Sequence, residues 1–273
     1  MKMLKTFAMT IMIVAITVNS SGCGSNNESN TETSQTINGT IASDSDKQEY
    51  EVKNDTITIV LDPGHGGENT GAKADVNGDG VIDLEKDLNM VVASHMIEIL
   101  NNYGSLHVEL TRYGDEELSH AQRAAIAKSF AKETLSKTVI LISIHNNANP
   151  YAQLEGVEAY VSVYDERYDW IATDLAYEMV DNISENFELL NRGVLTRVGR
   201  RHNDWYGIIR NGIVRDIPTI ILEQCFMDNP DDALKVLSDD EKLYKLAETN
   251  AYAIVEFFDL ELKKEFQTIN TIE

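Results

Sequence analysis

The sequence predicts one α/β domain in which helices cover both faces of a sheet. The first supporting observation is that five short runs of Ile, Val and Leu alternate with longer segments whose apolar residues recur at helical spacing. The second is composition. Of the 273 residues, 42% are hydrophobic and 25% are charged, as in ordinary globular proteins with a sizeable core. Such alternation is typical of a sheet covered by helices, where functional side chains gather at the carboxyl ends of strands.

The strand candidates are short, apolar and rich in β-branched residues, which favour extended backbone. They lie at residues 57–62, 106–111, 138–144, 157–163 and 218–223. We see no internal repeat among them, so one sheet in one domain is the expectation.

Four segments between and after the strands are helix candidates, because their apolar residues share one face at a period of 3.6. The first follows Glu85 and places Leu88, Val91, Val92, His95, Ile99 and Leu100 together. The others lie between Ala121 and Phe130, at 166–186 and at 240–258.

The amino terminus, residues 1–22, reads as a lipoprotein-type signal peptide. Lys2 and Lys5 precede an apolar run that is too short for a permanent transmembrane helix. Cys23 follows small residues as in a bacterial lipobox, although Ser20 stands where leucine is preferred. We expect export and a lipid on Cys23, which would anchor the protein at the outer face of the cytoplasmic membrane or in the cell wall. The alternative is a plain signal peptide cut nearby.

Three further segments follow the signal peptide. Residues 23–54 are rich in Ser, Asn, Thr and acidic residues and are predicted to be a disordered linker. Residues 55–262 are the predicted catalytic domain, and residues 263–273 are a C-terminal tail.

Charge and cysteine content narrow the function classes. The net charge of −22 argues against a nucleic-acid partner, because the phosphates would be repelled. A substrate should therefore be held by shape and by a local site. Of the two cysteines, Cys225 lies in an apolar run and is expected to pack as a small hydrophobe rather than to pair with Cys23. A monomer is favoured.

Titratable side chains end three of the apolar runs. These are His65 in "IVLDPGHGG", His145 in "ISIHNNAN" and Glu223 in "IILEQCF", and Glu85 opens the first long helix. Alone, a histidine after a strand usually bonds within a turn, and a glutamate at a helix start favours the helix dipole. A glutamate that ends an apolar strand is harder to dismiss, since a buried carboxylate needs a partner.

Together these residues suggest metal chemistry. Two imidazoles and one carboxylate are a common open zinc set, and a further carboxylate can act as general base. The three glycines around His65 would let its backbone approach a metal or a bulky ligand closely.

The strings "IVLDPGHGGENTGA", "LEKDLNM", "LTRYGDEELSHAQRAAIA", "ISIHNNAN", "GVEAYV" and "IPTIILEQCFMDNPDDA" resemble, in order, the zinc-dependent N-acetylmuramoyl-L-alanine amidases of the family 3 type. The resemblance covers about residues 57–258. It implies a twisted six-stranded mixed sheet with flanking helices and one Zn²⁺. It also implies a cell-wall hydrolase, or autolysin, that cleaves the amide between N-acetylmuramic acid and L-alanine in peptidoglycan. By position it assigns His65, Glu85 and His145 as zinc ligands and Glu223 as the catalytic carboxylate.

The chain departs from the family pattern at two places. Cys225 replaces a usual glycine, which predicts a local packing change. Asn146 replaces a usual alanine beside the second histidine, and its amide is expected to reach toward substrate.

A second cation site is suggested by "DVNGDGVID". Asp75, Asn77, Asp79 and Asp83 have the spacing of a calcium loop, but Lys86 stands where that loop ends in an acid. The alternative is a polar loop that crosses to the helix.

The other histidines are expected outside the site. His95, His107 and His120 are assigned to helix faces or the surface. For His202, in a loop with tryptophan and arginine, the alternatives are a surface position and the border of a substrate groove. Arg112 and Arg123 are expected to pair within the scaffold.

Other functions compete with the amidase. One is a peptidase that cuts the stem peptide, and another is a non-catalytic wall-binding lipoprotein. The retention of all four site residues favours an enzyme over a binder.

Overall fold

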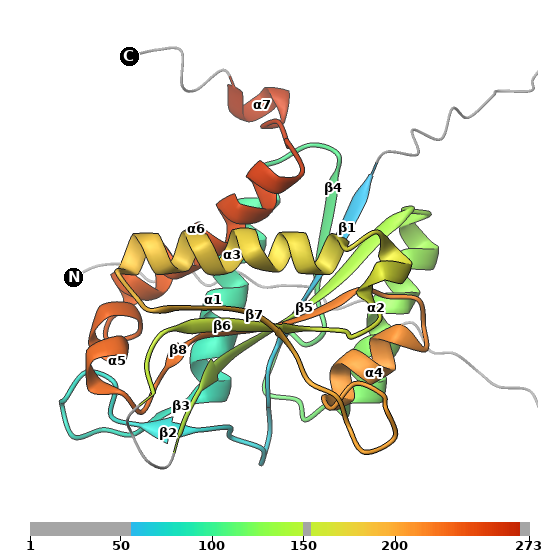
Figure 1. Cartoon of the computed structure of the whole chain (residues 1–273). Coiled ribbons are helices and arrows are strands. Elements are labelled where there is room, and N and C mark those ends of the chain that lie inside the picture. The colour runs from blue at the N-terminus through green and yellow to red at the C-terminus, as the bar shows by residue number, and fades with distance from the viewer. Residues whose placement is uncertain (1–55, 150–153, 268–273) are drawn as a thin grey trace, which may run out of the picture. The chain divides into compact units, whose positions relative to one another are not determined.

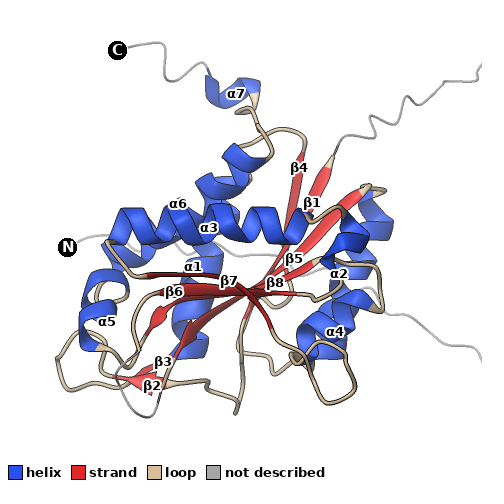
Figure 2. Cartoon of the chain, in the orientation of Figure 1, coloured by secondary structure: helices blue, strands red, loops and turns tan. Residues whose placement is uncertain are grey.

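The computed structural model describes residues 56–149 and 154–267. The predicted signal peptide, Cys23 and the whole predicted linker lie outside these residues. Figures 1 and 2 show strands flanked by helices. Among the described residues, no helix combines the length and apolarity needed to cross a bilayer.

Six strands form one mixed sheet in the order β4-β1-β5-β8-β6-β7. The strands are β1 (Ile57–Pro63), β4 (Leu106–Leu110), β5 (Thr138–Asn147), β6 (Val157–Val161), β7 (Asn191–Thr196) and β8 (Thr219–Phe226). Strands β4, β1, β5 and β8 are mutually parallel, and β6 runs antiparallel to β8. The predicted α/β class and six-stranded mixed sheet are thus confirmed. A separate two-stranded ladder joins β2 (Lys73–Ala74) to β3 (Asp83–Leu84).

The helices occupy both faces of the sheet, as predicted. They are α1 (Glu85–Leu100), α2 (His120–Thr134), α3 (Ile171–Phe187), α4 (Gly207–Ile213), α5 (Pro230–Val236), α6 (Asp240–Phe257) and α7 (Lys264–Gln267). The short α7 lies in the segment predicted as a tail, where Lys263 N–H donates to Asn102 O at 2.9 Å.

Two hydrophobic cores lie on opposite faces of the sheet. The larger one joins α1, α3 and α6 to one set of strand residues, including Ile59, Ile142 and Leu222. The smaller one joins α2 and α4 to the alternate set, including Val60, Leu141 and Ile221. Because strand side chains alternate between faces, the central strands β1, β5 and β8 contribute to both cores.

Helix α2 is fixed at its start by a capping box. The Gln122 N–H donates to Ser119 Oγ at 3.4 Å, and the Ser119 N–H donates to Gln122 Oε1 at 2.9 Å. Helix α1 has no side-chain cap, although Glu85 is its first residue. The Glu85 carboxylate is therefore free to turn toward the end of the sheet.

Some elements differ from the sequence-based expectation. Helix α3 begins at Ile171 rather than at 166, because Asp165–Tyr168 form a separate 3₁₀ turn and Trp170 has a φ of 62°. Strand β7 and helices α4 and α5 were not predicted from periodicity.

Candidate metal centre and active site

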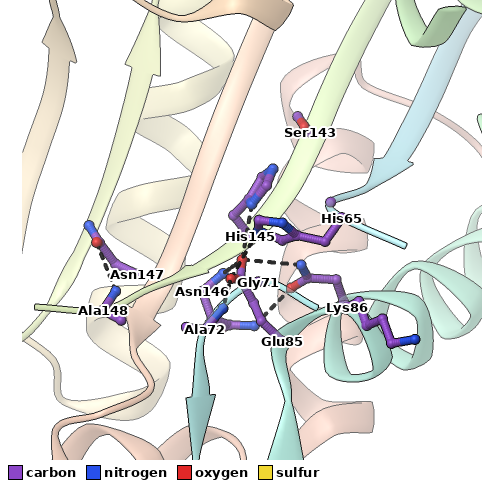
Figure 3. Close-up of polar contacts among 12 residues, drawn as sticks. His65, Gly71, Ala72, Glu85, Lys86, Ser143, His145, Asn146, Asn147 and Ala148 are labelled. Atoms are coloured by element: carbon purple, nitrogen blue, oxygen red, sulfur yellow. Dashed lines mark hydrogen bonds and ion pairs between the residues drawn. The ribbon is translucent and has the colours of Figure 1, made fainter. Parts of the chain in front are cut away.

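Three side chains from distant segments meet at one edge of the sheet. His65 follows β1, Glu85 begins α1, and His145 lies near the end of β5. His65 Nε2 lies 3.0 Å from Glu85 Oε2, and His145 Nδ1 lies 3.0 Å from Glu85 Oε1. Figure 3 shows the two imidazoles and the carboxylate pointing toward one another.

This group fits a metal ion. The ligand atoms of the three residues all lie within 4.8 Å of one another. Tetrahedral zinc with ligands about 2.1 Å away would separate its ligand atoms by about 3.4 Å. Between residues 56 and 149 and between 154 and 267, this is the one group of three or more such side chains that close together. The donor set suits zinc and leaves room for a further ligand.

The charges of the group are strongly coupled. Burial opposes ionisation of Glu85, but hydrogen bonds from His145 and His65 outweigh it and hold the pKa of Glu85 well below its usual range. Burial likewise opposes protonation of His145, yet the hydrogen bond with Glu85 and nearby carboxylates raise the pKa of His145. Negative charge at Glu85 is therefore favoured, as a cation ligand requires.

Outer hydrogen bonds orient the three side chains. Asn69 Oδ1 lies 2.9 Å from His65 Nδ1, so the opposite ring nitrogen, Nε2, faces Glu85. The Glu85 carboxylate accepts from Ala72 N–H at 2.8 Å and from Asn89 Nδ2 at 3.3 Å. Such partners fix ligand orientation and tune metal affinity.

Glycine is required where the backbone touches the ligands. A Cβ at Gly64 would lie 2.3 Å from the His145 ring, and one at Gly71 would lie 2.3 Å from Glu85 Oε2. His65 itself has a φ of 62°, a conformation that few side chains adopt without strain. Gly64 and Gly71 therefore serve close packing around the metal group, whereas a Cβ at Gly66 or Gly67 would instead meet Glu116 or Glu117.

Two buried arginines hold the turn that carries His65. Arg112 donates to Pro63 O at 3.0 Å and to Gly64 O at 3.1 Å. Arg123 donates to His65 O at 2.6 Å and pairs with buried Asp62 at 2.6 Å. The prediction that both arginines pair within the scaffold is confirmed.

Glu223 lies beside the metal group on β8, directly across from His145 on β5. Both line a cavity of about 320 Å³ with His65 and Glu85. Burial raises the pKa of Glu223 to about 7, and the charges of Glu85 and Glu158 act in the same direction. A carboxyl group with that pKa can both accept and return a proton near neutral pH.

A second carboxylate, Glu158, faces Glu223 across the β6–β8 pair. Arg192 Nε donates to it at 2.6 Å, and Tyr160 Oη and Asn147 Nδ2 each donate at 2.9 Å. With its oxygens occupied in this way, Glu158 is a neighbour of Glu223 rather than a second proton-transfer group.

The two departures from the family pattern contact each other. Cys225 is buried and has a free thiol, and its Sγ lies 3.6 Å from Asn146 Oδ1. Asn146 Nδ2 donates to Asn89 Oδ1 at 2.9 Å, and its backbone N–H donates to Glu85. The Asn146 side chain is thus engaged inside the protein, while Asn146 also lines the cavity, so its reach toward substrate stays a prediction. The prediction that Cys225 packs as a buried residue is confirmed.

His120, which was predicted on a helix face or at the surface, is exposed but also lines the cavity. His120 begins α2, and its ring packs so closely on Gly207 that a Cβ there would lie 2.2 Å from Nδ1. Burial, followed by the charge of Arg123, lowers the pKa of His120. Sequence reasoning missed this position because the packing of α4 on α2 was not predictable. By contrast, His107 lies beside Glu109 at 3.4 Å, and His202 is exposed and does not line the cavity.

The predicted calcium loop is folded by its own side chains. Asp75 accepts from the N–H groups of Gly78, Asp79 and Gly80 at 2.8–3.1 Å. Lys86 at the loop's last position binds Asp115 at 2.6 Å, away from the loop.

Comparison with known proteins gives a family match. The family described as N-acetylmuramoyl-L-alanine amidase matches residues 59–256.

Individual relatives agree with this match. The probable cell wall amidase LytH of Staphylococcus epidermidis is 30% identical over 175 residues, which are 64% of this chain and 50% of that protein. The chain therefore spans about half the length of the curated relatives it matches.

Solved structures give the same result. Cwp6 from Clostridium difficile is 29% identical with a TM-score of 0.64, over 74% of this chain and 29% of that one. The catalytic domain of CwlV from Bacillus (Paenibacillus) polymyxa var. colistinus is 25% identical with a TM-score of 0.58, over 76% of this chain and 100% of that one.

Proposed function

This chain belongs to the N-acetylmuramoyl-L-alanine amidase family, and from that premise we propose that it is a zinc-dependent enzyme that hydrolyses the amide between N-acetylmuramic acid and L-alanine in peptidoglycan. The observation that carries the proposal is the placement of Glu223 in one cavity with the metal group of His65, Glu85 and His145. A binding protein would have no need to retain a buried carboxylate with a raised pKa beside a metal site.

The proposed ligands are the two imidazoles and the Glu85 carboxylate. Held there, Zn²⁺ would supply Lewis-acid activation of water and of the scissile carbonyl. The outer hydrogen bonds from Asn69, Asn89 and Ala72 N–H keep these ligands oriented before any metal arrives.

Glu223 is the proposed proton-transfer residue. It accepts a proton from the water that attacks the lactyl carbonyl, so that a C–O bond forms. It then returns a proton to the L-alanine nitrogen as the C–N bond breaks. Burial, which raises the pKa of Glu223 to about 7 in the metal-free protein, favours a carboxyl group that can hold the proton between the two steps.

The test is product analysis on defined muropeptides by mass spectrometry. We expect a free lactyl carboxylate on the sugar and a peptide that begins with L-alanine. A chelator should abolish the reaction, and added Zn²⁺ should restore it. Cleavage inside the stem peptide would instead identify a peptidase.

We also propose that the protein acts outside the cytoplasm as a monomer and is anchored through a lipid on Cys23. The support is the apolar run of residues 6–18, followed by the lipobox-like sequence that ends at Cys23. Mass analysis of the membrane-bound protein should find a lipidated Cys23 at the amino terminus. A freely secreted, unmodified form would contradict the anchor.

The loop of Asp75, Asn77, Asp79 and Asp83 stays a predicted calcium site. Its carboxylates are partly oriented by backbone N–H groups, as in calcium loops. Added Ca²⁺ should raise the midpoint of thermal unfolding of the full chain but not of an Asp75→Ala variant. Equal midpoints with and without Ca²⁺ would remove the prediction.

A further inference from the structure

Arginine is concentrated in one segment of this acidic protein. The net charge is −22, yet residues 192–215 hold six of the nine arginines of the chain and a single acidic residue, Asp204. The segment carries no lysine. It is therefore a local positive region on a chain whose overall field would repel anions.

This segment also forms a wall of the catalytic cavity. It runs from β7 into α4, and Tyr206 and Gly207 at the start of α4 line the cavity with Glu223. The Tyr206 ring packs on Tyr160 with centroids 4.6 Å apart. The residues just before Tyr206 therefore adjoin this wall of the cavity along the chain.

Three of the six arginines have structural partners. Arg192 pairs with Glu158, Arg210 donates to Asp204 O at 2.8 Å, and Arg215 donates to Asn211 O at 3.0 Å. The remaining three are Arg197, Arg200 and Arg201, and all are exposed. In the part of the chain that the structure describes, no carboxylate lies within 4.0 Å of their guanidinium groups.

The loop that carries these three groups, residues 197–205, is built rigidly. We call it the arginine loop. Buried Asp204 accepts from Ser162 Oγ and from Val163 N–H at 2.8 Å each, which ties the loop to the end of β6. Within the loop, the Arg197 guanidinium lies 4.3 Å from the centre of the Trp205 ring. A fixed loop orders little on binding, so its charges are well placed to recognise a ligand.

We propose that the arginine loop binds carboxylates of the peptide part of the substrate and so selects acidic peptides for the catalytic cavity. This inference rests on the proposed amidase function and specifies its substrate class. A guanidinium group matches a carboxylate with two parallel hydrogen bonds, and the stacked Trp205 holds one such group in place. An anionic membrane is the weaker partner, because the loop exposes only two large apolar side chains, Val198 and Trp205, and the face of Trp205 is covered by Arg197.

The test compares two substrates of the full chain with Zn²⁺ added. One is N-acetylmuramoyl-L-alanyl-D-glutamate, whose peptide carries two carboxylates, and the other is its diamide. We expect kcat/KM to favour the acid by at least about tenfold, through KM rather than kcat. In the variant Arg197→Gln/Arg200→Gln/Arg201→Gln this preference should fall to about one. Arg200→Lys/Arg201→Lys should keep part of it, because the charge remains.

The matched control is Lys128→Gln/Lys132→Gln/Lys137→Gln, which removes the same charge from residues that do not line the cavity. It should keep the full preference. If it loses the preference as the arginine variant does, only net charge matters and the arginine loop is not a binding site. Thermal unfolding of each variant checks that it folds.

Direct binding separates this inference from the proposed function. Calorimetric titration of the two compounds into the Glu223→Gln variant measures recognition without turnover. Suppose that the parent enzyme cleaves neither compound, but that the acid binds more tightly than the diamide and this difference depends on the loop. That result would contradict only the amidase proposal. Equal affinity for the acid and the diamide would contradict the proposed role of the arginine loop. Sedimentation with anionic phospholipid vesicles that depends on the loop, without any preference for the acid, would contradict it too.

Discussion

The two faces of the sheet are covered very differently. Three helices of 16–18 residues, α1, α3 and α6, cover one face. The other face is covered by α2 and by the seven-residue α4. On this thinly covered face the strand side chains change from apolar to polar toward the carboxyl ends. Val60 gives way to Asp62, Leu141 to His145, and Ile221 to Glu223. One face thus supplies most of the stability, and the incomplete cover of the other leaves space for the cavity.

The sharpest way to test this division is the substitution Glu223→Gln. We expect a fall in kcat of about 10³-fold with metal content retained, because proton transfer is lost and no metal ligand is touched. Unaltered turnover by this variant would remove Glu223 from the mechanism.

The same variant should change stability with a defined pH dependence. Burial raises the pKa of Glu223 from 4.5 to about 7, so in metal-free protein its ionisation destabilises the fold increasingly as pH rises from about 4.5 to about 7. Glu223→Gln should therefore raise the midpoint of thermal unfolding in a chelator at pH 8 and leave it nearly unchanged at pH 4. A lower midpoint at pH 8 would show that the carboxylate is stabilising.

Neighbouring residues of β5 offer a matched pair for the two cores. Ile142 faces the larger core and Leu141 the smaller one, and both are fully buried. Ile142→Ala should lower the free energy of unfolding by about 2–5 kcal/mol with kcat per folded molecule retained. Leu141→Ala should also raise KM, because α4 can shift on the vacated site. Equal KM values for the two variants would argue against a division between the faces.

A smaller effect is expected at Asn89 of α1, whose side-chain amide donates to the Glu85 carboxylate. Asn89→Ala should weaken metal affinity by about 10–100-fold while the protein stays folded. Asn102→Ala, just beyond the end of the same helix, is the control, since its side-chain amide donates to the Glu98 carbonyl and not to a proposed ligand. Metal titration with a competing chelator measures both.

The smallest effect is expected at the start of α2, one of the two helices that cover the thinly covered face. Ser119→Ala removes the side-chain cap of α2 and should lower the free energy of unfolding by about 1 kcal/mol. Chemical denaturation measures the change. Because His120 follows immediately, a selective rise in KM would link the cap to the cavity wall, whereas a stability change above about 3 kcal/mol would contradict a simple cap.

The central strands and the candidate site residues at their ends, His65, His145 and Glu223, could be predicted from the sequence, because both signals are local. Glu85 opens a helix and lacks this signal, so its assignment depended on the family resemblance. A continuous apolar run marks a strand buried on both faces, and a polar residue at its end stands out. Strand β7, "NRGVLT", lacks this signal since it is a half-exposed edge strand. Helix α4, "GIIRNGI", is short and contains two glycines, so its place depends on contacts with α2 and β8 rather than on propensity. His120 and the Asn146–Cys225 contact were missed for the same reason, as both depend on long-range packing.

The hydrogen bonds from buried Arg112 and Arg123 to the turn that carries His65 have a consequence for how the protein acquires its metal ion. Arg123 reaches Pro63 O and His65 O across about 60 residues of chain, from a helix that supplies none of the three proposed ligands. Uptake of the ion should therefore lag behind formation of the individual strands and accompany the docking of that helix. A dye that reports free zinc during refolding would consequently time the last step of assembly.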